Sequence, residues 1–152
     1  MSFKLIVHGF RDGETIPKRY TCEGEDLSPA ITWEDAPGAA RSFVLIMDDP
    51  DAPAGTWNHW LLWDIPATET ELAERFRPGV TGASGTNDFG RRGYGGPCPP
   101  KGHGAHRYFF KLYALDVASL SLATGARRAE LDTAIQGHIL AEAHYMGRYE
   151  RK

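Results

Sequence analysis

The sequence has few cysteines and no long hydrophobic segment. Its 152 residues include only Cys22 and Cys98, too few for the disulfide frameworks that hold small secreted proteins together. The N-terminus lacks the extended apolar core of a signal peptide, and no stretch is long enough to span a bilayer. These absences predict a cytoplasmic protein in which both cysteines are reduced.

The sequence also lacks any long run of one charge sign. Its formal net charge is −3, and basic doublets such as Arg91-Arg92 and Arg127-Arg128 are too isolated to form a face for nucleic acid. There is no internal repeat, low-complexity tract or linker. A chain of 152 residues is of the size of one domain with a sizeable core, so residues 1–152 are expected to form a single domain.

Several segments have the composition of β-strands, and the connections between them are rich in proline and glycine. The run 42–47 is continuously apolar and is expected to be a central strand covered on both faces. The 30-residue spacing of βαβ units is absent. The sequence therefore predicts a mainly β protein, an antiparallel sandwich, with strands over Phe3–Val7, Ala30–Trp33, Ser42–Met47, His59–Ile65 and Arg107–Leu115.

Two segments are predicted to be helical. Residues Ala67–Phe76 have a composition that suits a helix, although their apolar face is thin. The pattern over Ala129–Met146 is stronger, with Gly147 as a C-terminal stop. Its apolar stripe comprises Leu131, Ile135, Ile139, Ala143 and Met146.

Three carboxylates follow the predicted central strand within the segment 48–53, DDPDAP. So many acids together must be solvated, paired with cations, or raised in pKa by desolvation. Two prolines fix the turn, and the Ala52–Pro53 bond is a candidate for the cis isomer. The plainer interpretation is an acidic surface turn.

A loop of unusual backbone precedes the last predicted strand. Segment 93–108, GYGGPCPPKGHGAHRY, contains stiff prolines and permissive glycines and ends in a histidine and a tyrosine. Strand alternation places His106, Tyr108 and Phe110 on one face. The same rule places His59 with Leu61 and Trp63, where a lone histidine is usually a hydrogen-bonded core residue.

If the chain brings Asp49, His59, His106 and Tyr108 together, they form a small polar cup with aromatic walls. Protonated imidazoles, a tyrosine hydroxyl and loop amides could hold a small anion there. Because Asp49 repels an anion unless it is neutralised, for instance by His59, the cup should bind phosphate-like groups better at mildly acidic pH.

Other chemistries find weaker support. A zinc site could draw on His59, Cys98, His103 and His106, but their spacing is loose for metal ligands. The serine elbow of hydrolases and the phosphate loop of nucleotide hydrolases are both absent. With little nearby positive charge, Cys98 is expected to be a buried structural cysteine rather than a reactive thiol. No metal or other cofactor is predicted.

The acidic segment 48–53, His59 within Trp-x-x-Trp, and the run GPCPPKG ending in His106-Arg107-Tyr108 resemble the motifs of the phosphatidylethanolamine-binding protein family. The bacterial Raf-kinase-inhibitor-like branch is the most similar, and the likeness covers nearly the whole chain. It implies a β-sandwich with Greek-key connections and a C-terminal helix. It also implies an anion pocket lined by Asp49, Asp51, His59, Gly96, Cys98, Pro100, His106 and Tyr108.

The resemblance further implies weak binding of phospholipid headgroups, nucleotides or simple anions, and in several members the binding of kinases or proteases. Two positions depart from eukaryotic relatives. Asn58-His59 stands where those relatives have a histidine pair, and Cys98 stands where they have glycine. Because of these two departures, the ligands and kinase partners of the eukaryotic relatives are not carried over directly to this chain.

Three functions therefore remain open. The leading one is a non-catalytic binding protein for a phosphate-bearing ligand, which could modulate a kinase or protease partner. The alternative is a hydrolase that uses His59 or His106 as general base on a phosphoester or ester. In a third, the surface inhibits a protease or kinase directly. The tryptophan-rich segment 57–63 could also form a homodimer interface, although interior packing is favoured.

Overall fold

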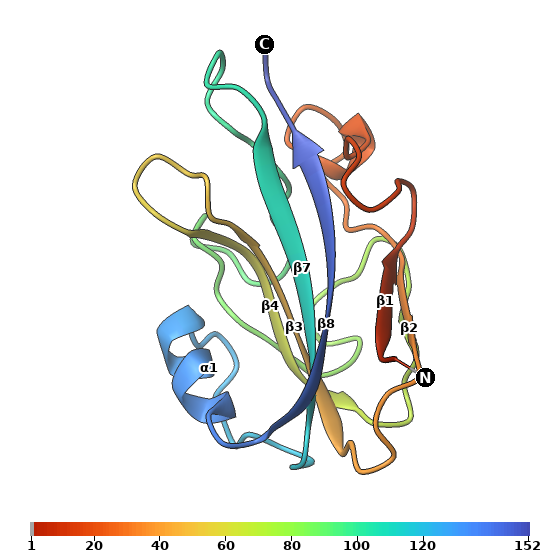
Figure 1. Cartoon of the computed structure of the whole chain (residues 1–152). Helices are drawn as coiled ribbons and strands as arrows, with labels where there is room; N and C mark the ends of the chain where they lie inside the picture. Colours follow the sequence, from red (N-terminus) through yellow and green to blue (C-terminus); the bar gives the residue numbers. More distant parts are fainter. Residues whose placement is uncertain (1) are drawn as a thin grey trace.

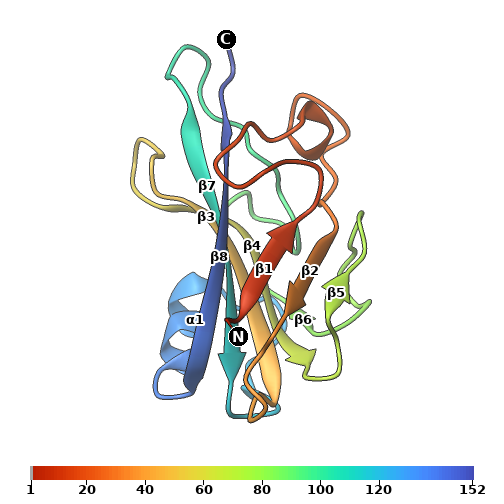
Figure 2. The same ribbon diagram turned by 45° about the vertical axis from the view of Figure 1, so that its right-hand side comes forward.

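Two antiparallel β-sheets and one short helix make up the architecture of the computed structural model, which describes residues 2–152. A five-stranded sheet runs through the middle of the molecule. A three-stranded sheet covers one face and the helix covers the other (Figures 1 and 2). The mainly β sandwich predicted from the sequence is confirmed.

The three-stranded sheet has the order β1-β2-β5, and the five-stranded sheet has the order β6-β4-β3-β7-β8. Every pair of neighbouring strands is antiparallel. The elements are β1 (Lys4–Val7), a 3-10 turn η1 (Lys18–Tyr20), β2 (Ile31–Glu34), β3 (Ser42–Asp49), β4 (Trp57–Pro66), β5 (Glu71–Leu72), β6 (Ala83–Ser84), β7 (His106–Leu115), α1 (Arg128–Ile135) and β8 (Ile139–Tyr149).

Strand β3 is central and buried along its whole length, as its apolar sequence predicts. Alternate side chains enter two different cores. Phe43, Leu45 and Met47 pack between the sheets, where Trp60 also lies, whereas Val44 and Ile46 pack under α1. Because a strand alternates its side chains, one continuous apolar run supplies both cores.

The tryptophans of β4 confirm the interior alternative. Trp60 and Trp63 are completely buried, and only Trp57, at the start of the strand, is substantially exposed. The segment is therefore core rather than a ready surface for a second copy.

The helix predicted over 67–76 is wrong. A turn closes from the Pro66 carbonyl to the Glu69 amide, and the chain then becomes β5, where Leu72 pairs with Ile31 of β2. Leu72 is buried in the core between the sheets. Burial of that one leucine overrides the local helix preference.

The predicted helix 129–146 is also wrong beyond its first two turns. Helix α1 ends at Ile135, and Gly137, with a φ of 81°, turns the chain into β8. Leu131 and Ile135 do belong to the buried helix face, but the rest of the stripe lies in a strand. Gly147, expected as a helix stop, lies within β8, where an added Cβ would collide with Phe10 and Ile16.

The two cysteines are not reduced thiols. Cys22 and Cys98 form a disulfide across a sequence separation of 76 residues, with their Cα atoms 5.4 Å apart. The fold brings together two loops that nothing in the cysteine spacing connects. Since disulfides are rare in the cytosol, the thiol argument for a cytoplasmic location no longer holds.

No helix within residues 2–152 is both long and apolar enough to cross a membrane. Within the same residues every peptide bond is trans, so the cis isomer considered for Ala52–Pro53 is not adopted.

Candidate functional site

A cavity of about 190 Å³ lies where β3 ends and where β4 and β7 begin. Three antiparallel neighbours therefore place their polar ends at one edge of the central sheet. The cavity is lined by Asp49, Ala52, Pro53, Trp57, His59, Phe89, Cys98, Pro99, Pro100, His106 and Tyr108.

Each of the three carboxylates in the acidic segment 48–53 has its own hydrogen-bond partner. Asp48 points to the helix side and accepts hydrogen bonds from Lys111 and Arg128, each at 2.9 Å. Asp49 points into the cavity and is 2.7 Å from His106, while Asp51 pairs with Arg107. Of the three possibilities that the sequence left open, pairing with a cationic or imidazole partner is the one observed.

A β-bulge sets the direction of His59. Met47 pairs with Trp60 but Asp48 pairs with Asn58, so His59 has no partner residue on β3. An extra residue in one strand redirects its side chain. The ring of His59 packs edge-on against Tyr108 at 5.2 Å, a residue of the core between the sheets. Simple alternation, which grouped His59 with Leu61 and Trp63, was wrong for this reason.

The protonation of His59 follows from its surroundings. Its Nδ1 lies 2.7 Å from the Gly95 carbonyl oxygen, which can only accept, so Nδ1 carries the proton and donates. Burial lowers the pKa of His59 below its usual value, against the opposing effects of the Gly95 carbonyl and the Asp49 charge. The neutral ring therefore keeps Nε2 as an acceptor on the cavity side.

Asp49, His106 and His103 form a chain of hydrogen bonds that leads out of the cavity. The Nδ1 of His106 donates to Asp49 Oδ2, and its Nε2 lies 2.7 Å from Nδ1 of His103. His106 is buried whereas His103 is exposed. Both ring nitrogens of His106 are thus occupied by protein groups, which fixes its tautomer when it is neutral. The sequence did not predict this role for His103.

Tyr108 supplies an unused hydrogen bond. Its side chain is completely buried, and its hydroxyl has no hydrogen-bond partner among residues 2–152. Burial, and then the charge of Asp49, raise the pKa of Tyr108 far above its usual value, so the hydroxyl remains a donor. Buried donors without a partner are rare because they cost free energy.

The rim of the cavity is apolar, and among residues 2–152 no lysine or arginine lines the cavity. Trp57 and Phe89 meet edge-on at 5.6 Å and are each 36% exposed. Phe89 comes from a turn that Asn87 holds by accepting the Phe89 amide proton. The ring of Phe89 can pack against Gly95 because Gly95 has no side chain. A Cβ at Gly95 would overlap the Phe89 ring. Phe89 could not be predicted from the sequence, since a lone aromatic in a turn has no distinguishing pattern.

Two predicted site residues do not line the cavity. Asp51 accepts from the Arg107 backbone amide and guanidinium on the outer surface. The Gly96 amide, expected to hold an anion, donates instead to Asp26 Oδ1. The loop 97–100 also offers few donors, because three of its four residues are proline. The remaining predicted residues, Asp49, His59, Cys98, Pro100, His106 and Tyr108, do line it.

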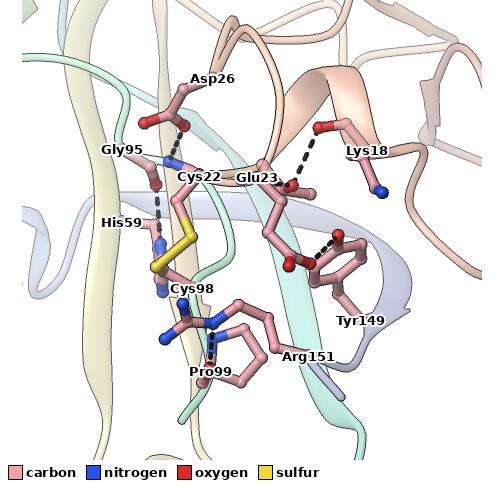
Figure 3. The surroundings of a disulfide bond; sticks show 12 residues. Lys18, Cys22, Glu23, Asp26, His59, Gly95, Cys98, Pro99, Tyr149 and Arg151 are labelled. Atoms are coloured by element: carbon pink, nitrogen blue, oxygen red, sulfur yellow. Dashed lines mark hydrogen bonds between the residues drawn. A yellow bond between two sulfur atoms is a disulfide. The ribbon is translucent and has the colours of Figure 1, made fainter. Parts of the chain in front are cut away.

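The disulfide forms part of the cavity wall through Cys98 (Figure 3). A disulfide sulfur is not a thiolate, so in this state Cys98 can act neither as a zinc ligand nor as a nucleophile. The candidate zinc ligands His103 and His106 are hydrogen-bonded directly to each other.

The chain has a two-sheet β fold with a small cavity at one edge of the central sheet, and the comparisons with known proteins identify its family. The family model for phosphatidylethanolamine-binding proteins matches residues 7–150. The chain therefore belongs to the phosphatidylethanolamine-binding protein family. Its assignment to the Raf-kinase-inhibitor-like branch stays a prediction.

Relatives from several bacteria share this family. The chain is 59% identical over 151 residues to a protein of Aquifex aeolicus described as a UPF0098 protein, covering 97% of this chain and 88% of that protein. Two crystal structures superimpose over 99% of both chains. One is a putative phosphatidylethanolamine-binding protein homologue, CT736 of Chlamydia trachomatis, with a TM-score of 0.91 and 39% identity. The other is YbcL of E. coli, with a TM-score of 0.92 and 32% identity.

Proposed function

We propose that this protein binds, without transforming it, a small phosphate-bearing ligand in the cavity at the ends of β3, β4 and β7. The observation that carries this proposal is the completely buried Tyr108 hydroxyl, which has no partner among residues 2–152. An acceptor oxygen in the cavity would satisfy that donor. Phosphate oxygens are strong acceptors, and the family description names a phospholipid.

The protonation of His59 makes such binding depend on pH. A neutral His59 offers an acceptor nitrogen, which disfavours a fully ionised phosphate. Binding therefore requires one proton, either on the phosphate or on Nε2 of His59. Burial lowers the pKa of free His59, so a proton on Nε2 requires a bound phosphate to raise that pKa again. By either route the affinity should increase as the pH falls.

The apolar rim favours a ligand with an organic group attached to the phosphate. Trp57 and Phe89 present ring surface at the mouth of the cavity, and inorganic phosphate would leave that surface uncovered. A phospholipid headgroup and a nucleotide phosphate both fit this description. Occupancy of the cavity could in turn modulate a protein partner such as a kinase or protease.

The proposal is tested by thermal-shift titration with phosphate and phosphorylethanolamine at pH 6 and pH 8. We expect saturable stabilisation that is stronger at pH 6, is larger for phosphorylethanolamine and disappears in His59→Ala. His144→Ala is the matched control, because His144 is an exposed histidine on β8 and should bind as wild type does. Equal stabilisation of wild type and His59→Ala would refute the assignment of the cavity.

The hydrolase alternative rests on one observation, the 2.7 Å contact between His106 and Asp49. A carboxylate that orients an imidazole is a frequent arrangement of general bases. Here, however, the other nitrogen of His106 faces His103 rather than open cavity. Release of phosphate from a phosphomonoester beyond one equivalent, abolished by His106→Ala, would establish turnover and replace the binding proposal.

A further inference from the structure

The disulfide joins the outside of the molecule to the wall of the cavity. Cys22 is an exposed residue in the loop that follows η1, whereas Cys98 is half-buried and lines the cavity. Figure 3 shows the bond bridging the two loops beside His59. A reductant can therefore approach from the Cys22 side without entering the cavity, and exposed disulfides are the more easily reduced ones.

The loop that contains Cys22 is held to the cavity wall by a small number of contacts. The amide of Cys22 donates to the Pro97 carbonyl at 3.1 Å, and the Gly96 amide donates to Asp26 Oδ1 at 2.8 Å. Glu23, Gly24 and Glu25, between these two attachments, are all exposed. The loop is also held by Tyr149, whose hydroxyl donates to Glu23, and by Arg75, which donates to Glu25 Oε2 at 3.2 Å. The disulfide is its covalent attachment to the cavity wall.

The segment 95–98 of the cavity wall connects the disulfide to His59. Gly95, which accepts from His59 Nδ1, is one residue from Gly96 and three from Cys98. Pro97, which lies between Gly95 and Cys98, stiffens this short connection, so a displacement of Cys98 is expected to reach Gly95. The Gly95 amide also donates to the His59 carbonyl oxygen at 2.9 Å, so release of Cys98 is expected to loosen the orientation of His59 rather than to free the ring.

We propose that the Cys22–Cys98 disulfide is a redox switch for the cavity, in which the oxidised form holds His59 in its binding orientation and reduction by a dithiol lowers ligand affinity. This inference rests on the proposed function, because it concerns regulation of the same site. The dithiol is either a small molecule or a protein with a paired-cysteine active site.

The chemistry is a thiol–disulfide exchange. A thiolate of the reductant attacks Sγ of Cys22, the Cys22–Cys98 bond breaks, and Cys98 leaves as a thiolate that takes up a proton. The second thiol of the reductant then attacks the mixed disulfide, which releases Cys22 as a thiol. Two electrons pass from the dithiol to the protein, so the reductant becomes a disulfide and the protein a dithiol.

The test compares oxidised protein, protein reduced with dithiothreitol, and Cys22→Ala, each titrated with phosphorylethanolamine at pH 6. Cys22 lies outside the cavity, so Cys22→Ala breaks the bond but leaves the Cys98 side chain in the wall. We expect about ten-fold weaker binding by reduced protein, since preorganisation is lost. Cys22→Ala should bind equally weakly and should not respond to dithiothreitol.

A second measurement does not depend on the ligand. Amide hydrogen exchange should accelerate about ten-fold at Gly96 on reduction as its local structure loosens, while the amide chemical shift of Leu45 in central strand β3 stays that of the folded protein. Reduced and oxidised protein that bind within two-fold of each other, with unchanged exchange at Gly96, would overturn the switch. Loss of the folded-state chemical shift at Leu45 would also overturn it, because the disulfide would then only maintain the fold.

The two proposals fail separately. If oxidised wild type does not bind phosphorylethanolamine, the proposed function fails. The exchange at Gly96 still decides whether the disulfide controls the cavity wall.

Discussion

At the scale of single residues, the proposed function depends most on Tyr108. Its hydroxyl is buried, has no hydrogen-bond partner of good geometry within residues 2–152 and lies near the Asp49 carboxylate, so Tyr108→Phe removes a donor that the protein leaves unsatisfied. We expect phosphorylethanolamine to bind about 0.5–1.5 kcal/mol more weakly, the contribution of one hydrogen bond, with stability unchanged or slightly higher. Calorimetric titration and thermal unfolding measure the two effects, and unchanged affinity would show that the hydroxyl does not contact the ligand.

The motif predicts Asp51 as a site residue, but in the structure Asp51 pairs with Arg107 outside the cavity. Its hydrogen bonds from the Arg107 guanidinium lower the pKa of Asp51 from 3.8 to about 2. We expect Arg107→Ala to raise that pKa toward 3.8, as measured by NMR titration of the carboxyl carbon. Because the folded-state pKa is the lower one, the stabilisation by the pair is complete above pH 3.8 and is lost as the pH falls through about 2.

The same variant tests the boundary of the site. Asp51 does not line the cavity, so Arg107→Ala should bind phosphorylethanolamine as wild type does. Weaker binding in that variant would return Asp51 to the site that the resemblance implied.

At the scale of elements, α1 serves the fold and not the cavity. Ile135 packs with Leu131 and Trp63 in the core beneath the helix. Ile135→Ala should lower the free energy of unfolding by about 2–5 kcal/mol, the usual cost of truncating a buried aliphatic side chain. Chemical denaturation measures this cost, and ligand affinity of the folded variant should not change.

The elements also show which patterns the sequence could reveal. The apolar run of β3 and the alternating side chains of β7 predicted both strands and their buried faces correctly. A strand shows its burial as a local pattern of apolar and polar residues. The apolar stripe over 129–146 led to the wrong prediction of one long helix. Apolar residues at helical spacing can also occur where a short helix ends and a strand follows it. Gly137 was the signal of this change, and its left-handed conformation ends α1.

The site was predictable as a set of residues but not as an arrangement. The motifs selected six of the residues that line the cavity. They did not indicate the bulge that turns His59, the chain from Asp49 to His103, or Phe89. Each of these depends on strand register or on contacts between loops distant in sequence, which local patterns do not encode.

At the scale of the whole molecule, the disulfide links the first quarter of the chain to the cavity loop. The entropy of the unfolded chain makes such a bond more stabilising when the closed loop is long. For cysteines separated by 76 residues, its loss should lower the free energy of unfolding by about 4 kcal/mol. Chemical denaturation of wild type with and without dithiothreitol measures the effect. Cys22→Ala should match the reduced protein, and equal stability of oxidised and reduced protein would contradict this prediction.

The cysteines were also where whole-molecule reasoning from sequence failed. Two thiols in a chain of this size needed no bond for stability, and their spacing carried no information about contact. The fold brings them together by placing the loop after η1 beside the loop 95–100 (Figure 3).

The central claim, that His59 takes part in binding a phosphate group, is tested most directly by nitrogen NMR of its imidazole during titration with phosphorylethanolamine. In the free protein at pH 7, Nδ1 should be protonated and Nε2 bare. At saturation, Nε2 should show a hydrogen bond or a proton shared with the ligand, with tighter binding at pH 6 than at pH 8. An Nε2 signal that stays unchanged at saturating ligand would contradict the account.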